Sequence, residues 1–259
     1  MKTSTPIRYW RIMRLILHLL FGLLEVALIF PMLRENQTRE ARISRWARKL
    51  CHILNIQVIN NAPSHRPSNA MLVANHISWL DIFVLDTVFV SRFVAKAEVR
   101  NWPFIGWLCQ QTGTLFIKRE RRHDTHKVNK QIAKILAAGN CVAIFPEGGT
   151  TCGMTTMAFN ASLLQPAVDA HAYILPVALS YYDQYGQRST AAAYIGEMSL
   201  LASIMQLVNQ PLLEVRLHYF PLIASNQSSR KDIANQARLL ITNHLSLNVR
   251  QDPQTVGLS

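Results

Sequence analysis

The stretch Asn75-His76-Ile77-Ser78-Trp79-Leu80-Asp81 follows a short apolar run at residues 70–74, and together they indicate how the chain folds. The apolar run has the composition and the abrupt polar end of a buried strand. Ser78 is a residue type that caps helices, and apolar side chains recur at helical spacing after it, so we expect a helix over residues 78–87. A histidine between the carboxyl end of a strand and a helix lies where open α/β sheets place their ligands.

Asp81 comes five positions after His76, about one helical turn past the expected bend. A carboxylate there is within reach of the imidazole, where it would fix the tautomer and leave the second ring nitrogen as a general base. The same residues also fit a buried histidine in a helix-cap hydrogen bond, with Asp81 only favouring the helix N-terminus. The spacing alone does not separate these two interpretations.

The composition indicates a globular protein with an anionic partner. The 259 residues suffice for one α/β domain, or for one domain with an appendage. An apolar content of 49% with 16% charged residues excludes a disordered chain and fits a protein that touches lipid. The net charge of +12 favours a membrane surface, a nucleic acid or a phosphorylated substrate as the partner.

Residues 12–33 form the most apolar segment and are interrupted by Arg14, His18 and Glu25. At about 1.5 Å per residue, such a helix is long enough to cross a hydrocarbon core of ~30 Å. We therefore expect it to span the membrane or to lie deeply embedded in it. Because Glu25 is costly in mid-span, a helix lying in one leaflet or packed on the domain is the alternative.

Residues 38–54 have the pattern of a basic amphipathic helix, with apolar side chains at three- and four-residue spacing and arginines on much of the remainder. This pattern favours an interfacial anchor for anionic headgroups, and the alternative is the solvated face of an ordinary globular helix. Basic residues beside the apolar segment place this end on the cytoplasmic side. We therefore divide the chain into membrane-embedded or interfacial helices at residues 1–55 and a catalytic domain at residues 56–259.

The catalytic domain alternates between strand and helix patterns. Strands are expected at residues 56–59, 70–74, 92–95, 114–118, 142–145, 173–179, 192–195 and 214–220. Helical patterns lie between several of them, at residues 78–87, 124–138, 155–170 and 230–245. This alternation predicts an α/β fold with a mixed, largely parallel sheet covered by helices on both faces.

Two further polar clusters follow apolar strands. Phe145-Pro146-Glu147-Gly148-Gly149-Thr150-Thr151 offers backbone amides that an anion can approach, and a carboxylate that accepts from a substrate hydroxyl or orients a neighbour. Phe116-Ile117-Lys118-Arg119 ends in a guanidinium suited to clamping a phosphate. Read alone, each also fits an ordinary solvated turn. Pro176 inside a strand pattern indicates an edge, a bulge or a wall of the cleft.

These motifs, in their order and spacing, resemble the four blocks of the glycerolipid acyltransferase family, and within it the bacterial 1-acylglycerol-3-phosphate O-acyltransferases. The matching residues are His76-x4-Asp81, Phe116-Ile117-Lys118-Arg119, Phe145-Pro146-Glu147-Gly148 and Leu175-Pro176-Val177. The resemblance covers roughly residues 50–225. It departs from the family at Gly149, where Thr usually follows Glu-Gly, and no Arg follows in this loop.

The resemblance implies that His76 is the general base and Asp81 its partner. It implies substrate binding by a second set of residues: Lys118, Arg119, Glu147, Gly148, Gly149, Thr150 and Pro176. The implied reaction transfers a fatty acyl group from acyl-CoA or acyl-carrier protein to the free hydroxyl of 1-acylglycerol-3-phosphate, giving phosphatidic acid in phospholipid biosynthesis. The thioester is a co-substrate, and no cofactor or metal is implied.

The expected partners are therefore anionic membrane lipids, lysophosphatidic acid and the acyl thioester. Nucleic acid is not expected, because the chain has no helix-turn-helix or stacked-aromatic signature. The expected location is the cytoplasmic face of a bacterial inner membrane. Three alternatives stay open: an acceptor such as lyso-ornithine lipid or another lysophospholipid, a non-catalytic peripheral lipid-binding protein, and a metal hydrolase using His76, Asp81 and Glu147.

Overall fold

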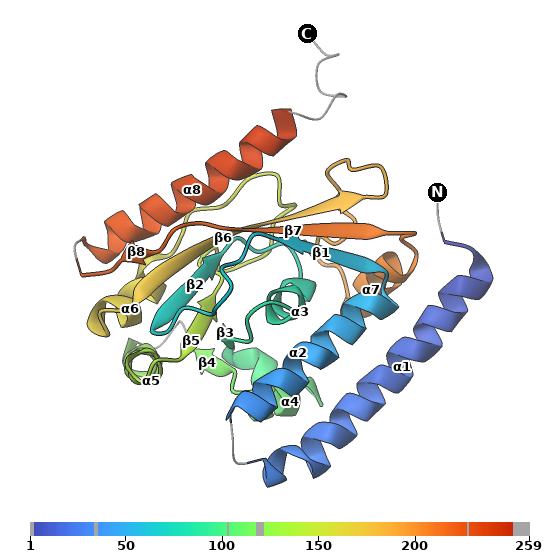
Figure 1. Cartoon of the computed structure of the whole chain (residues 1–259), viewed down its shortest axis with the longest axis horizontal. Coiled ribbons are helices and arrows are strands. Elements are labelled where there is room, and N and C mark those ends of the chain that lie inside the picture. Colours follow the sequence, from blue (N-terminus) through green and yellow to red (C-terminus); the bar gives the residue numbers. More distant parts are fainter. Residues whose placement is uncertain (1–2, 34–35, 103, 118–121, 227, 251–259) are drawn as a thin grey trace.

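A computed structural model describes residues 3–33, 36–102, 104–117, 122–226 and 228–250, and an eight-stranded sheet lies at its centre (Figure 1). Along the sheet the order is β1-β7-β6-β2-β5-β3-β4, and β8 pairs with β6. The strands are β1 (Ile56–Asn60), β2 (Ala70–Ala74), β3 (Arg92–Lys96), β4 (Leu115–Ile117), β5 (Cys141–Ile144), β6 (Tyr173–Asp183), β7 (Leu213–Tyr219) and β8 (Ile223–Ala224).

Most neighbouring strands run parallel. β2 lies between β5 and β6 and is parallel to both, and β3 is parallel to β4 and β5. Only β7 and β8 run antiparallel to β6, while β1 is parallel to β7. The predicted mixed, largely parallel sheet is confirmed. Because β2, β3 and β5 are parallel, their carboxyl ends meet at one edge of the sheet.

Helices cover both faces of the sheet. They are α1 (Thr5–Leu28), α2 (Asn36–Ile53), α3 (Leu80–Asp86), α4 (Ile105–Gln111), α5 (Arg122–Ala137), α6 (Gln165–Asp169), α7 (Leu200–Val208) and α8 (Arg230–Arg250), with 3-10 turns η1 (Phe30–Met32), η2 (Ala97–Asn101) and η3 (Ala161–Leu164). The alternation of side chains along β2 divides the core: Leu72 packs with α2, α3 and α7, whereas Met71 and Val73 pack with α5, α6 and α8. α2 thus shares the main core, so no break in packing marks residue 55.

The strand predicted at residues 192–195 was wrong. Ala192 and Ala193 are buried, as their composition indicates, but the Tyr194 N–H donates to the Ile77 carbonyl (2.9 Å) and not to a strand ladder. These residues therefore form a loop that packs on the segment containing His76.

The helix predicted at residues 155–170 was wrong in its first half. The chain forms η3 and then α6, which has Pro166 in its first turn. Upstream of them, the Met157 N–H donates to Glu147 and the Asn160 N–H to Pro146, so tertiary contacts take the donors that a helix would use. α4, α7 and β8 were not predicted.

α1 packs on the domain through a polar stripe. Arg11, His18 and Glu25 are spaced seven residues apart, and each contacts another element: Arg11 donates to the carbonyls of Val208, Gln210 and Pro211, His18 Nε2 lies 3.0 Å from the Trp46 carbonyl oxygen, and Glu25 pairs with Arg42 (2.6 Å). The opposite face is apolar and exposed, with Phe21 and Leu28 at 64% and 65%. Within the described residues, Thr5–Met32 is the one stretch long and apolar enough to cross a membrane.

Gly22 brings α1 close to α2, because a Cβ at this position would collide with the Trp46 indole. We expect Gly22→Leu to lower the free energy of unfolding by about 1–3 kcal/mol through overpacking, and to expose α1 to protease. The matched control is Ala27→Leu on the exposed face of the same helix, which should leave stability unchanged. Thermal unfolding and limited proteolysis in detergent measure both effects, and equal behaviour of the two variants would contradict this packing.

Candidate active site

The side chain of Asn75 continues the sheet past the end of β2. Its amide donates to the Leu179 carbonyl (3.0 Å) and accepts from the Leu179 N–H (2.8 Å), so it takes the place of a backbone partner for β6. Asn75 is fully buried. This contact fixes the backbone immediately before His76, and this role of Asn75 was not predicted from the sequence.

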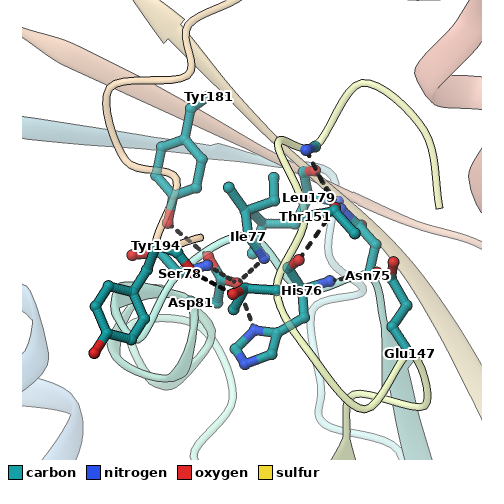
Figure 2. Close-up of polar contacts among 12 residues, drawn as sticks. Asn75, His76, Ile77, Ser78, Asp81, Glu147, Thr151, Leu179, Tyr181 and Tyr194 are labelled. Atoms are coloured by element: carbon teal, nitrogen blue, oxygen red, sulfur yellow. Dashed lines mark hydrogen bonds and ion pairs between the residues drawn. The ribbon is translucent and has the colours of Figure 1, made fainter. Parts of the chain in front are cut away.

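The backbone of His76 is held on both sides by the loop that follows β5 (Figure 2). The His76 N–H donates to Glu147 Oε1 (2.8 Å), and the His76 carbonyl accepts from the Thr151 N–H (2.8 Å). The two predicted clusters, at His76 and at Glu147, therefore lie together at the carboxyl edge of the parallel strands.

The imidazole of His76 contacts Asp81 as predicted. Nδ1 lies 2.9 Å from Asp81 Oδ2, and the ring stacks on Phe145 with centroids 3.9 Å apart. Because a carboxylate only accepts, Nδ1 carries the proton, so in the neutral ring Nε2 is the nitrogen with the free lone pair. The side chain is 19% exposed, and Nε2 has no hydrogen-bond partner among the described residues. This is the arrangement that a general base requires.

Asp81 is fully buried and accepts four hydrogen bonds from described residues. Besides His76, the donors are the N–H groups of Ile77 (2.7 Å) and Ser78 (2.9 Å) and the hydroxyl of Tyr181 (2.8 Å). Burial and the nearby Asp81 carboxylate raise the pKa of Tyr181 well above its usual range, so this hydroxyl stays a donor. Tyr181 lies on β6, 100 positions from Asp81, and only the fold reveals it.

The predicted helix cap by Ser78 was wrong. α3 begins at Leu80 with Trp79 in the cap position and no side-chain cap bond, and the Ser78 hydroxyl is buried without a partner among the described residues. Asp81 bends the chain instead, since its carboxylate binds two successive N–H groups before the helix.

Glu147 joins the two loops of the site. Its Oε1 accepts from His76 and its Oε2 accepts from the Met157 N–H (2.7 Å), so it orients backbone on both sides. Burial raises the pKa of Glu147, and the two backbone hydrogen bonds oppose that shift. The hypothesis that it orients a neighbour is supported, while direct contact with a substrate stays a prediction.

Successive positions in the loop after Glu147 allow different residue types. Gly148 has a φ of +77°, which favours glycine, whereas a Cβ at Gly149 would meet only Met157 at 3.7 Å, an ordinary contact. A Thr at position 149 is therefore sterically acceptable. Thr150 donates its hydroxyl to the Tyr194 carbonyl, which ties this loop to residues 191–195.

For three other residues, the predicted contact with a substrate is not tested by the structure. Lys118 and Arg119 lie outside the described residues. Pro176 is buried in β6, paired in register with Val73, where the neighbour of β6 changes from β8 to β7. Pro176 has no N–H to donate and lies where β6 switches partner, which agrees with the expected edge or bulge in this strand. Contact between Pro176 and a substrate stays a prediction. Within the described ranges, no three His, Cys, Asp or Glu side chains gather as a metal site would need.

The chain matches known acyltransferases. The model of the family described as Acyltransferase matches residues 55–180. The chain is 37% identical over 166 residues to the 1-acyl-sn-glycerol-3-phosphate acyltransferase of Neisseria meningitidis, covering 64% of each chain. It is 36% identical over 199 residues to the lyso-ornithine lipid O-acyltransferase of Pseudomonas aeruginosa, covering 76% of each chain. The chain thus spans less than two thirds of the Neisseria relative.

The fold also matches a crystal structure. The structure of the 1-acyl-sn-glycerophosphate acyltransferase from Thermotoga maritima superposes with a TM-score of 0.64 at 19% identity, covering 92% of this chain and 97% of that one. At this identity the likeness establishes the fold alone.

The Tyr181 hydroxyl stabilises the fold through Asp81. We expect Tyr181→Phe to lower the free energy of unfolding by about 1–3 kcal/mol, because it leaves a buried carboxylate oxygen without that donor. Tyr185→Phe is the matched control, since Tyr185 is 68% exposed and its hydroxyl has no partner among the described residues. Denaturant unfolding measures both, and an unchanged Tyr181→Phe variant would contradict the importance of this bond.

The raised pKa of Glu147 predicts a pH dependence of stability. As the pH rises above about 4.5, the unfolded chain loses this proton before the folded protein does, so this group's contribution to stability falls through that window. Glu147→Gln removes the titration, so we expect the variant to gain stability relative to the wild type as the pH rises. Glu197→Gln, at an exposed position, is the matched control variant, and the trend should be larger for Glu147→Gln than for this control. Unfolding curves measured across pH check it; an opposite trend would mean that the backbone hydrogen bonds outweigh burial.

Proposed function

Because the chain belongs to the acyltransferase family matched above, we propose that it transfers a fatty acyl group from acyl-CoA or acyl-carrier protein to the free hydroxyl of 1-acylglycerol-3-phosphate, giving phosphatidic acid. The observation that carries this proposal is the His76 imidazole, with Nδ1 bound to buried Asp81 and Nε2 open. The relatives named for this reaction and for a related lysolipid support it.

In the proposed reaction, Nε2 of His76 takes the proton of the acceptor hydroxyl as its oxygen attacks the thioester carbonyl. The tetrahedral intermediate then collapses, the C–S bond breaks, and the leaving thiolate receives the proton from the imidazolium. Both substrates are bound together, so no acyl-enzyme forms. Asp81 keeps the ring in one tautomer and stabilises its positive charge, while Phe145 holds the plane of the ring.

The acceptor phosphate requires cations that the imidazole pair does not supply. Arg119 and Lys118 are the residues we propose for it, on the family resemblance alone. The Glu147 loop supports the reaction by fixing the His76 backbone. The backbone amides around Gly148 are the candidates for stabilising the oxyanion, and such stabilisation is often worth ~3 kcal/mol per donor.

Lyso-ornithine lipid is the second candidate acceptor. The Pseudomonas relative with that name matches 76% of its own length, compared with 64% for the Neisseria relative. The loop after Glu147 also lacks an Arg, which weakens the case for phosphate binding there.

We further propose that α1 lies in one leaflet of the inner membrane, at its cytoplasmic face. Both ends of this segment contact the catalytic domain: the Thr3 N–H donates to the Asn209 carbonyl (3.0 Å), and Arg39 of α2 donates to the Phe30 carbonyl (2.9 Å). If α1 spanned the bilayer, the surfaces of the catalytic domain that contact it would also have to lie in the hydrocarbon core. With its polar stripe on the protein and its apolar face outward, α1 is suited to immersion beside the domain.

The reaction is tested with purified enzyme in detergent, acyl-CoA as donor, and thiol release as the readout. We expect His76→Ala to lower kcat at least about 10³-fold, since base catalysis and positioning are lost together. The variant should still fold, with some loss of stability because Asp81 loses one donor, and thermal unfolding checks this. His65→Ala, an exposed histidine, is the control and should retain activity. An active His76→Ala enzyme would end the proposal.

The same assay separates the acceptors. With 1-acylglycerol-3-phosphate and lyso-ornithine lipid offered side by side, the proposal expects the phosphate acceptor to give the higher kcat/KM. The reverse order would assign the second candidate. If neither acceptor raises thiol release above the level of His76→Ala, the result favours a non-catalytic lipid-binding protein.

The placement of α1 predicts that both termini lie on one side of the membrane. An epitope tag at either terminus should be protected from protease in spheroplasts and cleaved in inside-out vesicles. A tag at the N-terminus that is cleaved in spheroplasts would instead show that α1 spans the bilayer.

A further inference from the structure

A cavity of about 280 Å³ opens at the edge of the sheet opposite to His76. It is lined by the amino ends of β3 and β5, the first turns of α2, the end of α4 and the turn at Phe30. β3 begins at the cavity with Arg92 and ends at Lys96, roughly 13 Å away at about 3.3 Å per residue. Since β2 runs parallel, with His76 just past its carboxyl end, the cavity and the catalytic pair lie at opposite edges.

Three arginines from different parts of the chain line this cavity: Arg39 of α2, Arg66 of the loop before β2, and Arg92 of β3. The acid among the lining residues is Glu40, which pairs with Arg66 (2.8 Å). The lining therefore carries a net charge of +2, three arginines against one glutamate. The amides of Gln110 and Asn140 add neutral donors.

The guanidinium groups of Arg39 and Arg66 are hydrogen-bonded to the cavity wall, whereas Arg39 and Arg92 both have unused donors. Arg39 donates Nη2 to the Phe30 carbonyl (2.9 Å), and its Nε is buried without a partner among the described residues. Arg92 has no hydrogen bond or ion pair with any described residue, and its side chain lies over Gly113, where a Cβ would come within 3.6 Å of Arg92 Cγ. A buried donor without a partner costs free energy unless a ligand or water satisfies it.

A second carboxyl group, that of Asp86, lies behind the cavity, and its burial opposes the ionised form. Asp86 is buried and accepts from the Ser91 N–H (3.2 Å), and Ser91 lines the cavity. Burial, with Glu40 nearby, raises the pKa of Asp86 well above its usual range, which favours its neutral form. The first turns of α2 add the positive end of a helix dipole at the same place.

We infer that this cavity binds a phosphate group, with Arg39 and Arg92 as its ligands and Arg66 adding charge. Guanidinium groups bind phosphate oxygens in pairs, and the volume accommodates one phosphate with water. The site is separate from acyl transfer and does not depend on the proposed reaction.

The phosphate has two possible sources with the same chemistry: the headgroup of a membrane phospholipid, or free phosphate. The surroundings favour the headgroup. Phe30, at the end of the apolar segment, lines the cavity, and Met32, two residues further, is 79% exposed. A cavity beside exposed apolar side chains would lie at the level where a bilayer presents its phosphates.

The test measures binding to the full chain in a nonionic detergent by isothermal titration. The probes are inorganic phosphate and dihexanoyl phosphatidylglycerol below its micelle concentration. Arg92→Gln and Arg39→Gln should each weaken binding about tenfold or more, because each loses charge-assisted hydrogen bonds. Arg92→Lys, which keeps the charge but loses the planar fork, should fall between Arg92→Gln and the wild type.

Arg45→Gln is the matched control: it removes the same charge from an exposed position of α2 outside the cavity, and binding should not change. Binding of the lipid alone assigns the headgroup, and binding of inorganic phosphate assigns a free-phosphate site; both outcomes support the inference. It is overturned if the wild type binds neither probe, or if Arg45→Gln weakens binding as much as Arg92→Gln does. Because Arg39→Gln is an independent variant, a failure of Arg92→Gln to fold leaves the test intact.

Discussion

The site depends on one buried charge, the carboxylate of Asp81. An ionised carboxyl without solvent is costly unless hydrogen bonds replace its hydration, and here four donors do so. These donors come from the bend after β2, from the imidazole and from β6. A single anion therefore shapes the bend, starts α3 and attaches the histidine to the middle of the sheet.

The neighbouring polar groups are used in the same way. Asn75 pairs with β6, Glu147 joins His76 to Met157, and Thr150 and Thr151 bind carbonyls of adjacent loops. These polar side chains of the site are therefore engaged in holding backbone. The Nε2 of His76 is the contrast, since it faces the surface with no partner among the described residues. A rigid surrounding with one open basic atom is what general base catalysis requires.

The parts of this site that were predictable from the sequence are those formed by residues close together in the chain. β2 was predicted to the residue, and His76 and Asp81 meet because five positions across a bend bring them together. Tyr181 and the His76–Glu147 bond depend on sheet register over 100 and 71 positions, which periodicity does not encode. The same long-range contacts explain two errors, since the donors of Met157 and Tyr194 bind other loops and not a helix or a strand. Lys118 and Arg119 lie outside the described residues, so their place in the site stays a prediction.

The N-terminal segment shows why hydropathy alone left its placement open. An 18-residue window within it has a mean hydropathy of 2.2, which fits a spanning helix, and from the sequence Glu25 counted only as weakening that interpretation. Arg11, His18 and Glu25 recur every seven residues, which places all three on one side of a helix. On that side they meet carbonyls and Arg42 of the domain, so their polarity is satisfied by protein and the apolar side faces outward. Because the domain is bound to the polar side of this helix, the helix cannot enter the bilayer more deeply than the domain does. This limit on depth, more than the length of the helix, favours a position within one leaflet.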